Sequence, residues 1–183
     1  MKRNTIFASL LLALISCVYA AEDMGAGALP GESRGYLQKQ VDRGYTINFP
    51  KSWLTAPGWG SANDLYAYEA ESETEEIQAN IYIWQGDPSR LNLEQFFSAS
   101  IAELMAYTES FTINKVTDKK VAGLAAKRLV FSHVMDGRTF KVVQYYIIDK
   151  GTAYIITGNS LQDRYPQYEP TFDHVAGTFR ITP

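Results

Sequence analysis

Two stretches in the C-terminal half of the chain are apolar on both sides, and they restrict the fold more than any other feature. Residues 140–148 and 154–157 carry large apolar side chains at odd and even positions alike. A strand of this kind must be covered on both faces. The sequence therefore predicts the fold class α/β (α+β), with a three-layer α/β/α sandwich around a mainly antiparallel sheet.

Short turns predict how the strands of this sheet are connected. Ala122-Gly123, Asp136-Gly137 and Lys150-Gly151 each separate two strand-like stretches, and Asp136-Gly137 is a strong signal for a two-residue hairpin. The stretch after Phe111 is therefore expected to be an antiparallel meander. Earlier alternation predicts strands over residues 45–49, 65–70 and 77–84, and a last short strand is expected over 178–181.

Two helices are predicted as the outer layers. The first begins after Asn92, which can act as the N-cap with Gln95 three residues later. The second covers residues 165–176 and carries Tyr168, Phe172 and Val175. The apolar stripe of the first helix is expected to consist of Leu93, Phe97, Ile101, Leu104, Met105 and Thr108.

The N-terminus has the layout of a secretory signal peptide over residues 1–20. Lys2 and Arg3 precede an apolar run of about ten residues, and small side chains favour cleavage after Ala20. An alternative remains open, because residues 14–17 also resemble a lipobox in which Cys17 would be acylated. Residues 21–35 are expected to be a flexible tail or tether, followed by one globular domain over 36–183.

Composition and motifs exclude several classes of function. The 183 residues carry a net charge of −3, or −5 without Lys2 and Arg3, and no basic stripe, so nucleic-acid binding is not expected. Cys17 is the only cysteine, and neither His133 nor His174 has a second ligand at metal-binding spacing. No phosphate-binding loop or nucleophile elbow is present. We therefore expect no catalytic residue, no metal site and no cofactor.

Aromatic side chains are the candidate binding residues. Tyrosine and tryptophan recur in binding surfaces because they combine a large contact area with a polar group. Two of them share a face with polar residues of the strand over 77–84, which predicts a partly exposed surface, although packing in the core is the alternative. The candidates are Trp53, Trp59, Tyr66, Tyr82 and Trp84, with Tyr68 beside them. Five glutamates in residues 69–76 predict a solvated loop or, alternatively, a weak cation site.

Several packing motifs resemble those of the PsbP-like family. Residues 44–53 have its glycine-aromatic opening and its proline-x-x-Trp53 ending, and residues 154–158, Phe172 and 178–181 match its C-terminal half. The resemblance covers about 140 residues and implies the sandwich fold without a catalytic centre. The signal peptide fits the DcrB-type envelope proteins of this family.

The resemblance and the signal peptide together predict a function. We expect an exported, periplasmic protein that is non-catalytic and supports binding or assembly in the bacterial cell envelope through a protein partner. It would contact the membrane only through a lipid anchor at Cys17. A periplasmic small-ligand or divalent-cation binding protein is the alternative.

Overall fold

The computed structural model describes residues 36–41, 44–57, 65–69 and 79–182. Trp59, Cys17 and most of the acidic stretch lie outside these residues, as do the predicted signal peptide and tether. Seven of the described strands form an antiparallel sheet with the order β3-β4-β5-β9-β8-β7-β6. Its strands are β3 (Leu54–Pro57), β4 (Leu65–Glu69), β5 (Ala79–Gly86), β6 (Glu109–Val121), β7 (Leu124–Met135), β8 (Arg138–Asp149) and β9 (Thr152–Leu161).

The three predicted turns connect β6 to β9 as a meander. Asp136 and Gly137 have φ angles of 52° and 72°, and the other two turns also place both central residues at positive φ. This is the geometry of two-residue hairpins that matches the twist of the flanking strands. The predicted antiparallel meander and its short turns, including the Asp136-Gly137 hairpin, are confirmed.

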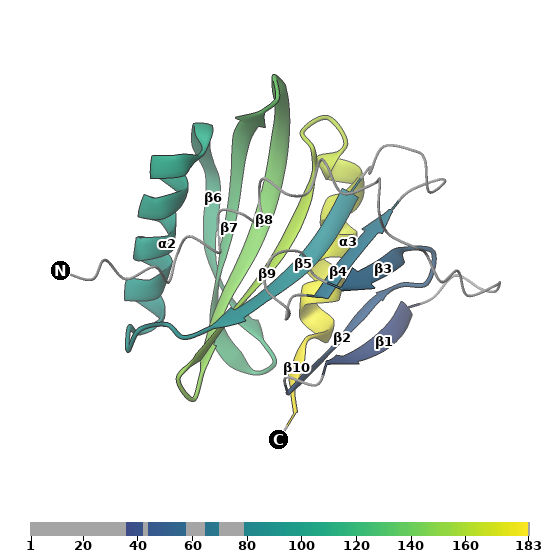
Figure 1. Cartoon of the computed structure of the whole chain (residues 1–183), viewed down its shortest axis with the longest axis vertical. Coiled ribbons are helices and arrows are strands. Elements are labelled where there is room, and N and C mark those ends of the chain that lie inside the picture. The colour runs from purple at the N-terminus through teal and green to yellow at the C-terminus, as the bar shows by residue number, and fades with distance from the viewer. Residues whose placement is uncertain (1–35, 42–43, 58–64, 70–78, 183) are drawn as a thin grey trace.

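Two helices cover opposite faces of the sheet (Figure 1). Helix α2 (Leu93–Tyr107) packs on β6, β7 and β8, and α3 (Tyr165–Thr178) lies on the other side. Alternate residues of β8 support this arrangement, because Val142 and Tyr146 pack with α2, whereas Tyr145 and Ile147 pack with α3. The predicted three-layer architecture is therefore confirmed.

The start of α2 is fixed as the sequence predicts. The Gln95 N–H donates to Asn92 Oδ1 at 3.0 Å, and the Asn92 N–H donates to Gln95 Oε1 at 3.1 Å. These two bonds form a capping box. The predicted stripe is wrong in one place: Met105 is 62% exposed, whereas Phe96 is buried. The buried face of the helix is turned toward Trp84, which stacks on Phe96 at 6.2 Å between ring centroids.

Helix α3 approaches the sheet closely at Gly158 in β9. A Cβ atom at this position would lie 2.5 Å from Cγ of Phe172, which is closer than real Cβ contacts come. The missing side chain thus lets the Phe172 ring lie directly on the sheet backbone.

A second sheet joins the two ends of the domain and was not predicted. Strand β2 (Tyr45–Pro50) pairs with β1 (Tyr36–Val41) on one side and with β10 (Arg180–Ile181) on the other. The Asn48 N–H also donates to Thr178 Oγ1 at 2.9 Å, so α3 and β2 are connected directly. Strands β1 and β3 were missed as well.

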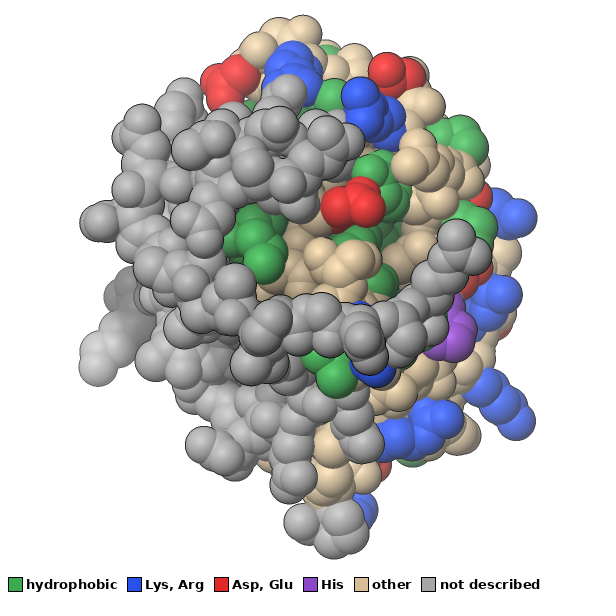
Figure 2. All heavy atoms as spheres, turned by 90° about the vertical axis from the view of Figure 1, so that its right-hand side faces the viewer, with side chains coloured by type: hydrophobic (Ala, Val, Ile, Leu, Met, Phe, Trp, Pro, Cys, Tyr) green, Lys and Arg blue, Asp and Glu red, His purple; other side chains and the backbone are tan. Residues whose placement is uncertain are grey.

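No helix in the described ranges is long and apolar enough to cross a membrane. Figure 2 shows the side that carries β1, β3 and β4, where the described Lys, Arg, Asp and Glu side chains are interspersed rather than gathered by sign.

Candidate functional site

The predicted aromatic residues do not form one exposed surface. Trp53 lies on the α3 side, where its ring makes edge contacts with Tyr168 and Phe172 at 6.4 and 6.5 Å. Tyr66, Tyr82 and Trp84 lie on the α2 face, and none of the four described rings is more than 7% exposed. The expectation of a partly exposed patch is therefore wrong for these four. Strand alternation does not reveal that both faces of β5 are covered. A role of these four aromatic residues in binding stays a prediction.

Tyr66 and Tyr82 belong instead to a buried group of polar side chains on the α2 face. They are neighbours across β4 and β5, and Tyr82 is in register with Thr157 of β9, which is in register with Gln144 of β8. We call this group the polar cluster; it consists of Tyr66, Asn80, Tyr82, Gln144, Thr157 and Asn159, all of them buried.

Hydrogen bonds connect part of the polar cluster. The Tyr146 hydroxyl donates to Gln144 Oε1 at 2.5 Å, and Gln144 Nε2 donates to Thr157 Oγ1 at 3.2 Å. Asn159 Oδ1 is buried and has no hydrogen-bond partner among the described residues. Since buried polar atoms are nearly always hydrogen-bonded, this oxygen is a position where a further donor is expected.

One acidic side chain acts on the same region. Glu103 of α2 has a buried Oε2 atom without a hydrogen-bond partner in the described part of the chain. Burial raises the pKa of Glu103 above its usual range. Burial also raises the pKa of Tyr146, and the nearby Tyr82 and Glu103 raise it further. Glu103 therefore lies close enough to influence the phenol that donates to the polar cluster.

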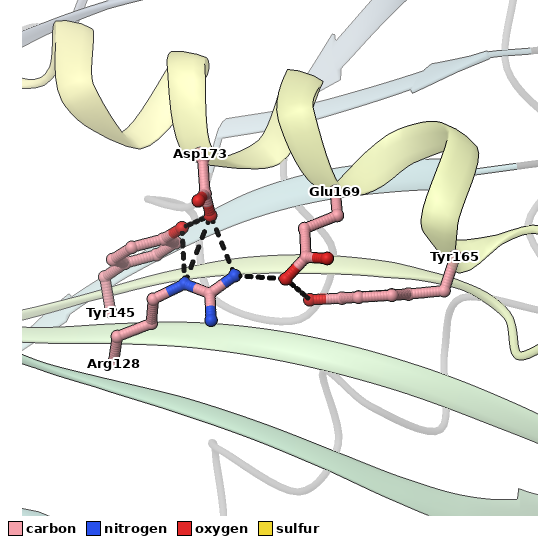
Figure 3. A network of polar contacts seen from close by, with 5 residues as sticks. All are labelled: Arg128, Tyr145, Tyr165, Glu169 and Asp173. Carbon is pink, nitrogen blue, oxygen red and sulfur yellow. Dashed lines mark hydrogen bonds and ion pairs between the residues drawn. The ribbon is translucent and has the colours of Figure 1, made fainter. Parts of the chain in front are cut away.

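A second polar group lies on the α3 face and centres on Arg128 of β7 (Figure 3). Its guanidinium donates through Nη2 to Glu169 at 2.6 Å and to Asp173 at 2.9 Å, both carried by α3. The Tyr145 hydroxyl also bonds to Asp173, and the Tyr165 hydroxyl donates to Glu169 at 3.4 Å. We call these five residues the Arg128 network.

Burial and charge differ within the Arg128 network. The Arg128 side chain is 5% exposed, whereas the side chains of Glu169 and Asp173 are 42% and 45% exposed. Burial opposes the charged guanidinium, but its bonds to Tyr145 and Glu169 outweigh this effect and raise the pKa of Arg128. Burial and Asp173 raise the pKa of Tyr145. The network therefore keeps a permanent buried cation that ties α3 to the sheet.

The Arg128 network was not predicted, although the sequence contains a signal for it. Arg128 alternates with Ala126 and Val130, which both pack against α3. Glu169 and Asp173 are four residues apart on the predicted helix, so they share one of its faces. A charged residue in a core position and two acids on the covering helix together favour a buried ion pair.

Neither histidine is placed as a metal ligand. His133 is buried on β7 beside the Phe140 ring at 5.8 Å, and burial lowers the pKa of His133. His174 is exposed and lies against the Tyr36 ring at 4.1 Å. Within the described ranges, no group of three or more His, Cys, Asp or Glu side chains could hold a metal ion.

Only the first glutamate of the acidic stretch is described. Glu69 ends β4 and hydrogen bonds to Tyr168 of α3; burial, together with this bond, raises the pKa of Tyr168 to about 12. Glu69 is therefore engaged with α3, and the predicted cation site at the remaining glutamates lies outside the described residues.

Apolar side chains are exposed at the β6 edge of the large sheet. Ile113 and Val116 are in register with Phe131 and Leu129, which pack with α2, so both lie on the α2 face. Among the described strands, β6 pairs only with β7. We call this area the β6 surface; it consists of Met105, Tyr107, Ile113 and Val116, each at least 44% exposed.

The layers, the meander and the two covering helices define a Mog1p/PsbP-like fold, as the sequence resemblance predicted. No family model and no curated protein matches the chain by sequence. The similarity is found among solved structures.

Three of these structures show how far the similarity extends. PA94 from Pseudomonas aeruginosa, a protein of unknown function, has a TM-score of 0.61 with 15% identity over 81% of this chain and 98% of its own. Cyanobacterial PsbP (CyanoP) from Synechocystis sp. PCC 6803 has a TM-score of 0.61 with 13% identity over 85% and 98%. The Ran-binding protein Mog1p of Saccharomyces cerevisiae has a TM-score of 0.58 with 11% identity over 81% and 96%.

Proposed function

We propose that this chain is a non-catalytic binding protein of the bacterial cell envelope, which supports assembly by contacting a protein partner. The observation that carries this proposal is the β6 surface, where apolar side chains are exposed beside the edge of a 13-residue strand that pairs with no other described strand. Edge strands offer backbone donors and acceptors to an added strand, and exposed apolar side chains add contact area.

The charges along β6 indicate what kind of segment would bind. Lys115, Lys119 and Lys120 are exposed on this strand, whereas the chain as a whole is acidic. Asp118, which is also on β6, is engaged by Lys127 at 2.6 Å. We therefore expect an extended segment of the partner that carries acidic residues between apolar ones.

The fold comparison is compatible with a binding role. One protein of the same fold, Mog1p, is a Ran-binding protein. Binding without catalysis also agrees with the motif content of the sequence, which has no phosphate-binding loop and no nucleophile elbow.

Site-specific photo-crosslinking tests the partner and the surface together. A photoreactive phenylalanine analogue at Val116 should give a discrete crosslinked product in envelope extracts of a producing bacterium. The same photoreactive analogue at position 167, in place of Gln167, which is exposed on α3, is the matched control and should not give this product. When the analogue is placed at position 113 instead, the additional substitution Val116→Asp should lower the yield of the crosslinked product at least tenfold. Equal products from both positions would contradict the proposal.

Export and anchoring are tested by the intact mass of the mature protein. Cleavage after Ala20 predicts a product that begins at Ala21 without added mass. Acylation of Cys17 predicts a product that begins at Cys17, carries acyl chains and is released from membranes by Cys17→Ser. An intact N-terminus in cell fractions would contradict export by either route.

A further inference from the structure

The direction of the backbone groups along β6 follows from the turns on either side of β7. The two-residue turns that flank β7 are closed by the pairs Val121–Leu124 and Met135–Arg138. Backbone N–H and C=O groups alternate in direction along an antiparallel strand, so even-numbered residues of β7 bond to β6 and odd-numbered residues bond to β8. A residue of β6 that lies opposite an odd-numbered residue of β7 therefore turns its backbone groups toward the open edge.

The register between β6 and β7 shifts by one residue in the middle of β6. Ile113 pairs with Phe131, whereas Lys115 pairs with Val130. Because of this shift, Ile113 and Val116 both lie opposite odd-numbered residues, and both direct backbone groups to the open edge and side chains to the α2 face. The two halves of the edge are therefore related by an approximate two-fold axis at the shift.

A second copy of the chain matches this edge in an antiparallel register. In a symmetric pair, Ile113 of each copy can lie opposite Val116 of the other, and Thr112 then lies opposite Thr117. This register brings edge-directed backbone groups of both copies together on either side of the shift. It also covers two apolar side chains that are each 44% exposed in the single chain. Apolar pairs and threonine pairs across strands stabilise such a ladder.

The charges on β6 favour the same register. It brings Glu109 of each copy toward Lys120 of the other, at both ends of the shared ladder, and both side chains are exposed. Lys115 then lies opposite Asn114. Sliding the copies toward their lysine-rich ends places Lys115 opposite its own counterpart or opposite Lys119, and like charges in direct opposition destabilise a ladder. The lysines therefore restrict which pairing this edge accepts.

We propose that two copies of this chain pair through β6 in this register, so that two seven-stranded sheets become one continuous sheet. The exposed Met105 and Tyr107 of α2 would lie on the same face of the sheet as the joined apolar side chains. The pair occupies the edge that a partner segment would use, so self-association regulates access to the β6 surface. This regulatory consequence rests on the proposed function, whereas the pairing itself does not.

Sedimentation velocity of the purified protein tests the pairing. The mass should rise from that of one chain to that of two as concentration increases. Val116→Asp places an acid opposite Ile113 and should raise the dissociation constant at least tenfold, with an unchanged circular dichroism spectrum. A single-chain mass at every concentration would overturn the proposal.

A charge exchange tests the register. Glu109→Lys and Lys120→Glu should each raise the dissociation constant at least fivefold, and the two substitutions together should restore it. Lys51→Glu makes the same charge change as Lys120→Glu at an exposed position after β2, and should leave pairing unchanged. Failure of the double variant to restore pairing, or an equal effect of Lys51→Glu, would overturn the proposal.

Disulfide trapping measures the register directly in a chain that carries Cys17→Ser. Thr112→Cys together with Thr117→Cys should form a covalent dimer on mild oxidation. Thr112→Cys with Lys119→Cys, which lies on the same face two residues further along, should form it at least tenfold more slowly. Equal rates would contradict the register and overturn the proposal.

The outcomes separate this proposal from the proposed function. A protein that stays a single chain but still gives the Val116 crosslink to another protein would overturn the pairing and leave the proposed function in place. A protein that pairs, but gives in extracts only a crosslinked product of two of its own chains, would support the pairing and contradict the proposed function.

Discussion

Arg128 is a buried cation that faces two partly exposed carboxylates, and this asymmetry determines how the network responds to substitution. The guanidinium has exchanged water for side-chain partners, whereas Glu169 and Asp173 keep about half of their exposure. Loss of either carboxylate leaves the other in place. Loss of the arginine leaves two like charges on one face of α3, together with an unfilled volume beside Tyr145.

Arg128→Gln should lower the free energy of unfolding by about 2 kcal/mol, which is within the range for removing hydrogen bonds to charged groups. Urea unfolding followed by circular dichroism measures the change. Lys119→Gln removes an exposed cation from the neighbouring strand and should change stability by less than about 0.5 kcal/mol. Similar effects of the two substitutions would show that the network does not hold α3.

His133 should make stability depend on pH. Its pKa in the folded protein is lowered by burial, so the unfolded chain takes up a proton first as pH falls. The stabilising contribution is complete above about pH 6.5, the ordinary histidine value, and decreases below it by at most about 1.4 kcal/mol per pH unit. Burial raises the pKa of Glu103, so its contribution has the opposite sign and increases as pH falls.

The measurement compares the free energy of unfolding at pH 7.5 and pH 5.5. The unmodified protein should lose stability over this interval, and His133→Phe should lose less, since a phenyl ring fits between Phe131 and Phe140 without titrating. His174→Gln should keep the full decrease, because His174 is exposed. An unchanged slope in His133→Phe would assign the pH dependence to other groups.

The contact between α3 and β9 depends on the absence of a side chain at one position. Gly158→Ala would bring a methyl group within 2.5 Å of the Phe172 ring, so the helix or the ring must move. We expect a loss of about 1–3 kcal/mol in urea unfolding, the usual range for overpacking. Gly177→Ala is the matched control because its Cβ would meet nothing within 4 Å. It should be neutral or slightly stabilising in the helix.

Elements governed by local chemistry could be predicted from the sequence. The hairpins follow from glycine turns such as Asp136-Gly137, and the start of α2 follows from Asn92 and Gln95. The apolar character of both faces of β8 predicted two covering layers. In contrast, β1 and β3 were missed because the short strands lack strong alternation, and their pairing depends on partners elsewhere in the chain.

The candidate sites were less accessible to sequence reasoning than the fold. Exposure of Trp84 depends on the placement of Phe96, which alternation within β5 does not report. Arg128 meets Asp173 across 45 residues of sequence, and no spacing rule connects a strand residue with a later helix in this way. The polar cluster likewise depends on the strand order β5-β9-β8, which places Asn80 beside Asn159.

At the scale of the whole molecule, two kinds of contact hold the domain together. The meander from β6 to β9 is built from pairings between neighbours in sequence. The small sheet instead joins residues near both ends, since Ile181 pairs with Tyr45 and the Thr182 N–H donates to the Gly44 carbonyl at 2.8 Å.

Removal of residues 180–183 should therefore destabilise more than its short length implies. The truncation leaves β1 as the one described neighbour of β2 and exposes the other edge of β2, so the thermal midpoint should fall by several degrees. Removal of residue 183 alone is the control and should have little effect. Equal midpoints for the two truncated chains would show that β10 contributes nothing to the domain.

The pairing of β10 with β2 also determines when the fold can be completed during synthesis. Residues 180–181, which give β2 its second described neighbour, are translated after every strand of the meander. Until they are available, β2 has β1 as its one described neighbour in the small sheet, and a two-stranded ribbon is only marginally stable. During synthesis the meander can therefore form while one edge of β2 is still open, which exposes that edge to chaperones or to export machinery before the domain closes.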